Sequence, residues 1–512
     1  MRTRIVLVPA AAALVAAYAF LFAGAIPAGS AAAADGPEFV LQADPASPFV
    51  SFRIWVRTGS AHDPAGKEGL ACLTGSLIGR GGTVARSYDE ILQALFPMAA
   101  GYDVTIDREM TVLEGTVHKD HLGTYYELIR DALLAPAFRE DDFARLQAEQ
   151  VNTLRTRLRY GDDEELAKAV LTWVAFAGTS YAHPEEGLVQ SVEKLAVEDV
   201  REFHGAHFTR DNIVVGLAGC FGDEFVARMR QDLARLPAGP APAFVPPEPP
   251  KRAPGRRVFL IEKDTRATAI SFGHPIAITR AADDFYPLMV ANSWLGEHRS
   301  SAAHLYQVMR TARGLNYGDY SYIEYFDHGS RRQVPAPNHA RHRQMFEVWI
   351  RPVTNANRHF ALRQAVREVT RLVQTGLRPE ELELTRNYLL NFSRNYATTE
   401  SMRLGYALDD RFYGLPESHL DRLRSRLAAV EIEEVRGALR RHIRPGSIDI
   451  VMVTQDAEAL KRALTADAFS PIRYASPASQ AILEEDELIQ EYPLGVAEEN
   501  VVILPVESVF ER

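Results

Sequence analysis

The sequence predicts an α+β protein of two homologous repeats, each a largely antiparallel sheet covered by helices, joined by a Pro-rich linker as in a clamshell. The first observation behind this prediction is the linker, residues 236–255, whose many prolines exclude helix and central strand. The second observation is an internal repeat on either side of the linker. The third is the order of strand-like and helix-like segments, which lets strands pair within each half while helices gather between them.

The repeat is clearest where each half ends. A constant offset of 235 residues aligns matching positions without a gap: Val200 with Val435, His207 with His442, and Ile213 with Ile448. In both halves an acidic pair opens a helix, and an apolar strand follows that helix. The shared spacing and charge favour a duplicated unit over two unrelated helix–strand pairs.

Apolar periodicity places the elements in a similar order in the two halves. In the first half we expect strands at 52–58, 102–106, 110–117 and 213–219, and helices at 66–78, 88–96, 119–134, 140–175 and 197–208. In the second half we expect strands at 269–272, 317–326, 345–353 and 448–453, and helices at 285–295, 301–312, 358–374, from Pro379 onwards and at 432–443. The chain is predicted to divide into a signal peptide at 1–34, two domains at 35–235 and 256–470, and an acidic tail at 471–512. The apolar end of the tail must pack on its own chain or on a partner.

The N-terminus has the layout of a secretory signal peptide. A basic start with Arg2 and Arg4 precedes a long apolar run, and Ala32 and Ala34 form an A-x-A cleavage signal before Asp35. Because the run approaches the length of a membrane span, an uncleaved anchor is the alternative. We therefore expect an exported protein, periplasmic or extracellular, that contacts a membrane only if this segment is kept.

The net charge and the number of cysteines exclude further classes of partner and fold. The formal net charge of the chain is −10, whereas nucleic-acid binding needs clustered Lys and Arg, so we expect no nucleic-acid partner. The two cysteines, Cys72 and Cys220, are too few for a disulfide framework. Two separate buried thiols are the favoured interpretation, and one bridge between them is the alternative.

An ordered set of segments along nearly the whole chain resembles the insulinase/pitrilysin-type metallopeptidases, and is most similar to the smaller bacterial and mitochondrial processing peptidases. The segments are Gly59-Ser60, Gly69-Leu-Ala, Tyr181-Ala-His-Pro-Glu-Glu-Gly187, Val197–Phe203, Asn212-Ile-Val-Val with Gly219, Leu295-Gly296 and Leu305–Tyr317. The resemblance implies subunits of two repeats that close around a peptide chamber. It also matches the segment Gly101–Ile106 to a strand edge at which zinc-bearing relatives add a peptide.

The resemblance further implies an inverted zinc motif, H-x-x-E-H, on the first helix, with a Glu ligand downstream. Here the histidine positions hold Cys72 and Ser76, and the general-base position holds Gly75. The downstream ligand would lie within 152–157, which contains two arginines and no Glu. A catalytic zinc needs three protein ligands and an open position, so we expect this chain to bind no metal or cofactor. The residues alone predict an ordinary core face on this helix.

Three histidine pairs are the remaining candidates for a relocated metal site. The members of each pair are three residues apart: His118 and His121, His204 and His207, and His339 and His342. No acidic residue accompanies any pair as a water-activating base in a matching motif, and we interpret each as a surface pair. The sequence also contains no Ser/His/Asp motif, phosphate loop or dinucleotide fingerprint.

The second half keeps a pair of residues with a substrate-binding counterpart. Arg310 and Tyr317 stand where the resemblance implies an Arg/Tyr pair that holds a peptide at the zinc. A guanidinium and a phenol are both donors, able to hold a peptide carbonyl and the oxyanion formed on attack. The alternative is structural: Arg310 offsets the dipole of a helix that ends at Gly314, and Tyr317 opens a Tyr-rich strand.

Two functions of different classes follow. The resemblance implies the non-zinc subunit of an exported heteromeric metalloprotease, a heterodimer with a zinc-bearing homologue, in which Arg310 and Tyr317 bind a peptide or unfolded protein at the partner's zinc. Whether the chain is an enzyme is left open, because activity is expected only with that partner. The alternative is a non-proteolytic peptide- or protein-binding scaffold of the same fold.

Overall fold

The computed structural model describes residues 36–240, 242–251, 254–329, 332–474 and 477–512. The signal segment predicted at 1–34 lies outside these residues. From Gly36 to Arg512 the chain forms one compact unit. Within the described ranges, no helix is both long and apolar enough to cross a membrane.

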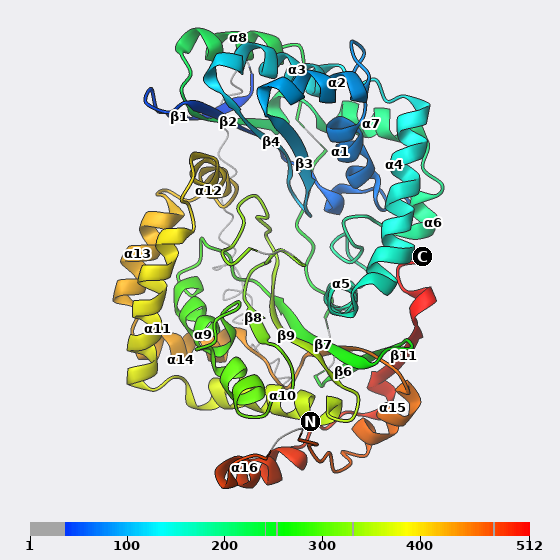
Figure 1. Ribbon diagram of the computed structural model, residues 1–512, viewed down its shortest axis with the longest axis vertical. Coiled ribbons are helices and arrows are strands. Elements are labelled where there is room, and N and C mark those ends of the chain that lie inside the picture. The colour runs from blue at the N-terminus through cyan, green and yellow to red at the C-terminus, as the bar shows by residue number, and fades with distance from the viewer. Residues whose placement is uncertain (1–35, 241, 252–253, 330–331, 475–476) are drawn as a thin grey trace, which may run out of the picture. The chain divides into compact units, whose positions relative to one another are not determined.

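The first half is organised by a five-stranded sheet in the order β1-β5-β2-β4-β3 (Figure 1). Its strands are β1 (Glu38–Ala43), β2 (Phe49–Val56), β3 (Gly101–Ile106), β4 (Thr111–His118) and β5 (Ile213–Gly219). Strands β1 and β5 pair in parallel, and the other neighbours are antiparallel. The sequence of β2 alternates as a half-buried strand does, yet both faces of β2 are buried after its first residue. Something must therefore cover the second face of this sheet.

The second half repeats this topology. Its sheet has the order β11-β6-β10-β7-β9-β8. The strands are β6 (Arg257–Glu262), β7 (Ala267–Ile276), β8 (Asp319–Tyr322), β9 (Gln344–Thr354), β10 (Asp449–Thr454) and β11 (Val501–Pro505). Taken in chain order, β6 to β10 occupy the positions that β1 to β5 hold in the first sheet, and β11 is added at the edge. The predicted α+β fold of two repeats is confirmed.

Helices cover one face of each sheet with the residues of their own half. In the first half they are α1 (Leu70–Arg80), α2 (Tyr88–Leu95), α3 (Leu122–Leu134), α4 (Glu140–Asn152), α6 (Val189–Val192), α7 (Val197–His207) and α8 (Asp223–Leu233). In the second half they are α9 (Phe285–Gly296), α10 (Arg358–Thr375), α11 (Pro379–Phe392), α13 (His419–Ala429), α14 (Ile432–His442), α15 (Ala457–Thr465) and α16 (Gln480–Gln490). Helices α7 and α14 keep the offset of 235 residues.

The opposite faces are covered by an exchange of helices between the halves. Helix α5 (Asp163–Ala175) of the first half packs on β7, β9 and β10 of the second sheet (Figure 1). Its Leu166 and Val170 are fully buried in a cluster with Val451 of β10. In return, α12 (Glu400–Phe412) of the second half packs on β1, β2 and β5, where Leu408 meets the side chains of the first sheet. Each half therefore completes the other's core.

The helix predicted at 140–175 is wrong in one respect, because it is two helices with a break. Helix α4 runs into a π-helical segment, η4 (Thr153–Gly161), and α5 begins after Asp162. The backbone of Asp162 is extended, and its carboxylate accepts hydrogen bonds from the N–H groups of Glu164 and Glu165 at 2.9 and 3.3 Å. This N-cap ends one helix and starts the next at an angle that sends α5 to the other half.

The C-terminal tail packs on its own chain. After β11 joins the second sheet, the last residues reach the first half, where the N–H groups of Val189 and Gln190 donate to the carbonyls of Phe510 and Glu511 at 2.9 and 3.1 Å. Phe510 is fully buried there. The tail therefore connects both halves. The two cysteines are half-buried and unpaired.

Candidate functional site

Helix α1, which carries the altered motif positions, begins at a buried carboxylate. Asp63 accepts hydrogen bonds from the N–H groups of Gly69 and Ala71 at 2.6 and 2.7 Å. The side chain of Asp63 thereby satisfies two N–H groups that have no partner within the helix, and burial raises the pKa of this carboxyl group to about 8. The helix is thus held firmly in place although it carries no catalytic residues of the family pattern.

The general-base position on this helix has no room for a side chain. A Cβ atom added to Gly75 would lie 2.6 Å from both Cγ1 and Cδ1 of Ile106 and 3.3 Å from Cγ1 of Val104. Both residues belong to β3, which packs directly on α1. The space that a catalytic Glu would need is therefore filled by apolar side chains, so the loss of the base is steric as well as chemical.

The other motif positions do not suit a zinc ion. Burial raises the pKa of the Cys72 thiol well above its ordinary value, and the nearby carboxylates of Glu186 and Asp63 raise it further. A metal ligand must be the thiolate, which this environment disfavours. Ser76 hydrogen-bonds to the Cys72 side chain. Among the residues that the structure describes, no group of three His, Cys, Asp or Glu side chains is placed to hold a metal ion.

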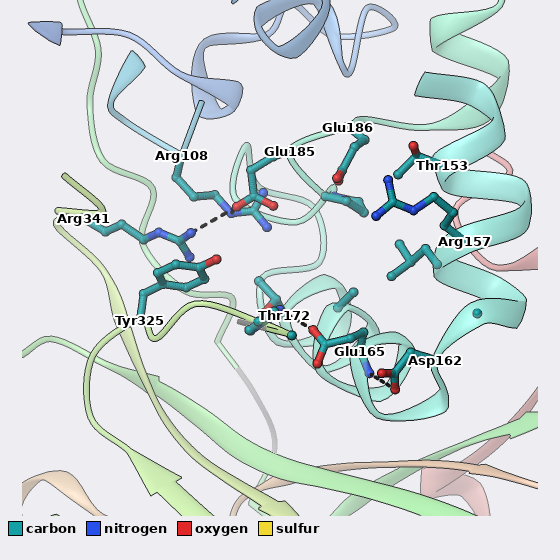
Figure 2. Close-up of a pocket in the computed structure, with 16 residues that line it drawn as sticks. Arg108, Thr153, Arg157, Asp162, Glu165, Thr172, Glu185, Glu186, Tyr325 and Arg341 are labelled. Carbon is teal, nitrogen blue, oxygen red and sulfur yellow. Dashed lines mark hydrogen bonds and ion pairs between the residues drawn. The ribbon is translucent and has the colours of Figure 1, made fainter. Parts of the chain in front are cut away.

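A cavity of about 640 Å³ lies where the α4–α5 region of the first half faces the β8–β9 loop of the second (Figure 2). Its charged lining comes from both halves: Arg108, Arg157, Asp162, Glu165, Glu185, Glu186 and Arg341. Arg157 belongs to the η4 segment, where the downstream metal ligand was sought, and its side chain points from that segment into the cavity. A guanidinium thus stands in the region where the family pattern has a carboxylate.

Next to this cavity, a buried ion network joins the two halves. Asp107, which follows β3 and is 2% exposed, accepts hydrogen bonds from Nε and one terminal nitrogen of Arg341 at 2.6 and 2.8 Å. His339 lies between two carboxylates, with Nδ1 at 2.7 Å from Asp107 and Nε2 at 3.1 Å from Asp327. Arg341 also contacts Glu185 at 3.1 Å. These contacts tie the β8–β9 loop to the first half.

Electrostatics keep the members of this network charged. Burial alone would raise the pKa of Asp107, but Arg341 and His339 together hold it well below the usual range. Burial alone would lower the pKa of His339, but hydrogen bonds to Asp107 and Asp327 raise it to about 10. The network therefore stays ionised through the neutral pH range.

The interpretation of the histidine pairs as surface pairs is wrong for His204 and His207 and for His339, whereas His342 is exposed. His204 and His207 pack in the core of the first half, and burial lowers the pKa of each to about 4. His339 belongs to the ion network, and its neighbour His342 bonds through Nδ1 to Glu109 at 2.6 Å. The spacing of His339 and His342 gave no sign of their partners, because Asp107 and Glu109 come from the other half of the chain.

Arg310 and Tyr317 lie together at the surface. The guanidinium carbon of Arg310 stands 4.7 Å from the ring centroid of Tyr306 and 5.6 Å from that of Tyr317. Arg310 belongs to a π-helical turn, η6 (Tyr306–Thr311), which is shorter than the helix predicted at 301–312. Tyr317 is 75% exposed, and neither residue lines the cavity between the halves. The pair thus faces outwards, held in position by cation–π contacts.

Little in the sequence marks the charged residues of the network beside the cavity as buried. Asp107, Arg108 and Glu109 form a charged triplet between two apolar strands, and this position was the one local signal. Charges between paired strands are often solvated turn residues, so the triplet alone does not reveal burial. All three are buried, at 2–4% exposure.

With this geometry in view, the chain can be compared with known proteins. Residues 38–187 match the family model described as Insulinase (Peptidase family M16), and residues 194–389 match the model described as Peptidase M16 inactive domain. An uncharacterized zinc protease, YmxG, of Bacillus subtilis is 21% identical over 415 residues, which cover 79% of this chain and 93% of that protein.

Two further proteins have a similar sequence or structure. A non-peptidase homolog, also YmxG, of Helicobacter pylori is 21% identical over 335 residues, covering 64% of this chain and 71% of its own. The solved structure of a peptidase M16 inactive domain protein from Pseudomonas fluorescens matches with a TM-score of 0.71 and 20% identity, covering 82% of this chain and 96% of that one. At this identity the structural match supports the fold.

Proposed function

Because the chain belongs to the insulinase-type M16 peptidase family, we propose that it is the non-catalytic subunit of an exported heteromeric metallopeptidase, which holds a peptide at the zinc of a partner subunit. The observation that carries this proposal is the contrast between the two halves. In the first half, helix α1 carries the altered zinc-motif positions, and its Gly75 is packed against Ile106. The second half presents Arg310 and Tyr317 at the surface, already paired through their side chains.

The chemistry of the pair suits a peptide that approaches from outside the chain. Arg310 brings a fixed positive charge, and the exposed hydroxyl of Tyr317 brings a second donor. Two donors held near each other can bind a peptide carbonyl and the oxyanion that develops when water attacks it. The attacking water would belong to a zinc site on the partner, since this chain is expected to bind no zinc of its own.

The test is reconstitution with a zinc-bearing homologue from the same source. We expect the pure chain to bind no stoichiometric zinc and to cleave no peptide, and the mixture to cleave. Arg310→Ala and Tyr317→Phe should each reduce kcat/KM of the mixture by about a hundredfold without separating the subunits. Tyr317→Phe keeps the ring beside Arg310 and removes the hydroxyl alone.

Matched controls lie elsewhere on the surface. Arg378→Ala changes an exposed arginine of the α11 N-cap, and Tyr160→Phe removes a hydroxyl that bonds only Glu507 at 3.2 Å among the described residues. Both should leave cleavage unchanged. Full activity of the Arg310 and Tyr317 variants would refute the substrate-binding role. Stable pairing with a partner that lacks a peptidase motif would favour the scaffold function instead.

A further inference from the structure

The cavity between the halves contains an arginine that forms no ion pair with the residues described. Arg157 makes no hydrogen bond or ion pair in that part of the chain, although four carboxyl groups line the same cavity and its charge acts on one of them, Glu186. Its side chain is exposed and points into the cavity (Figure 2). The neighbouring arginine of the same segment, Arg155, is paired with Glu193 at 2.7 Å and with Glu511 at 3.3 Å. Arg157 is therefore available to a ligand.

Other donor groups line the same cavity. The Nε atom of Arg108, a residue that is only 3% exposed, has no hydrogen-bond acceptor among the described residues, although it forms an ion pair with Glu185 at 3.4 Å. The hydroxyls of Thr153 and Tyr325 line the cavity and make no hydrogen bond within the residues described. Burial raises the pKa of Tyr325 well above its ordinary value, so its hydroxyl remains a donor. A buried donor without an acceptor is costly unless something binds it.

The acidic residues of the lining limit which anion fits. Glu185 is already shared by Arg108 and Arg341, at 3.4 and 3.1 Å. Glu186 stands beside Arg157 without contacting it, and would repel a dianion such as phosphate more strongly than a single negative charge. A carboxylate carries one charge and matches the planar fork of a guanidinium. Glu186 can accept a hydrogen bond from an N–H group next to that carboxylate.

We propose that this cavity binds a carboxylate, with the guanidinium of Arg157 as its main donor and the hydroxyl of Thr153, which lies beside it, as a further donor (Figure 2). Its volume of about 640 Å³ lies within the range of small-molecule sites. The carboxylate is either the free C-terminus of a short peptide or a small organic acid. This inference does not depend on the proposed partner, because every residue it uses belongs to this chain.

The test is isothermal titration calorimetry of the full chain with N-acetyl-dialanine, with its C-terminal amide, and with sodium acetate. The acid should bind at least about tenfold more tightly than the amide. Arg157→Gln should abolish this preference, and Thr153→Val should weaken it. Arg145→Gln, an exposed arginine of α4 that pairs with Asp142 outside the cavity, should preserve it.

The outcomes separate cleanly. Displacement of the peptide acid by acetate identifies a small-acid site, and failure of acetate to displace it identifies a peptide terminus. Equal binding of acid and amide overturns the proposal, as does an unchanged preference in the Arg157 variant or no binding of either acid. Arg157 is exposed and makes no hydrogen bond or ion pair within the described residues, so the variant should keep the wild-type unfolding midpoint.

Discussion

Replacing Arg341 by Met should destabilise the chain strongly, because it leaves a buried charge without its main partner. The guanidinium makes two hydrogen bonds to Asp107, at 2.6 and 2.8 Å, and contacts Glu185 at 3.1 Å. Asp107 is 2% exposed, so water does not replace the lost bonds. Breaking one side of a buried ion pair costs about 3–5 kcal/mol. We expect the free energy of unfolding to fall by that amount.

The assay is urea unfolding followed by tryptophan fluorescence and by circular dichroism, whose transitions must coincide for a two-state analysis. The double variant Asp107→Asn with Arg341→Met removes both charges and should recover most of the loss. The control is Arg145→Met, which breaks a pair of 2.7 Å between an exposed guanidinium and the half-buried carboxylate of Asp142. Pairs at the surface contribute about 0–1 kcal/mol, so this variant should lose much less stability than Arg341→Met.

Two results would refute the reasoning. If Arg341→Met costs no more than the Arg145 control, the network between the halves does not stabilise the fold. If the double variant is as unstable as the single one, the loss does not come from an unpaired charge on Asp107. In that case the stacking of the Arg341 guanidinium on Tyr325, with the guanidinium carbon 3.9 Å from the ring centroid, would be the stabilising part.

Three further predictions follow from other features. The pKa of His339 is raised to about 10, so the stability that this histidine adds is present in full below about pH 6.5 and is lost as the pH rises towards 10. The free energy of unfolding should fall by at most about 1.4 kcal/mol per pH unit in this range. Chemical denaturation at a series of pH values should show this slope in the wild type and a flatter one in His339→Gln. Restoring the base by Gly75→Glu should lower the unfolding midpoint, because the new side chain overlaps Ile106, and it should give no zinc in metal analysis even with histidines at the two other motif positions. Phe510→Ala should cost about 3–5 kcal/mol of unfolding free energy, since Phe510 is fully buried against the first half; a loss below 1 kcal/mol would mean that the tail is not part of the core.

Much of the fold could be predicted from sequence because its signals are local or repeated. Helix caps, strand alternation and the offset between Val200 and Val435 each need only neighbouring residues or a direct comparison. The break at Asp162 was missed because the apolar pattern continues through it, while the N-cap that ends the helix is a single side chain. The exchange of α5 and α12 was missed because an amphipathic helix does not reveal which sheet it covers.

For the candidate site, the sequence predicts only the missing zinc ligands and the missing general base. Cys72, Gly75 and Ser76 can be read directly as motif positions without ligands. The closure of the Gly75 position by Ile106 depends on the distance between a helix and a strand, which no residue pattern encodes. The pairing of Arg341 with Asp107 spans 234 residues, and a charged residue in a single sequence is expected at the surface.

Because the halves exchange helices, the segment that was duplicated in evolution is not the segment that folds by itself. The repeat implies that each half descends from one ancestral segment, and the Pro-rich linker is the natural place at which to divide the chain into two fragments. A fragment ending before the linker would carry α5 with no sheet beneath it, and its own sheet would expose the surface that Leu408 and its neighbours cover. Neither half is therefore an autonomous domain, and an expression strategy that divides the chain at the linker should yield two insoluble fragments that become soluble only when made together.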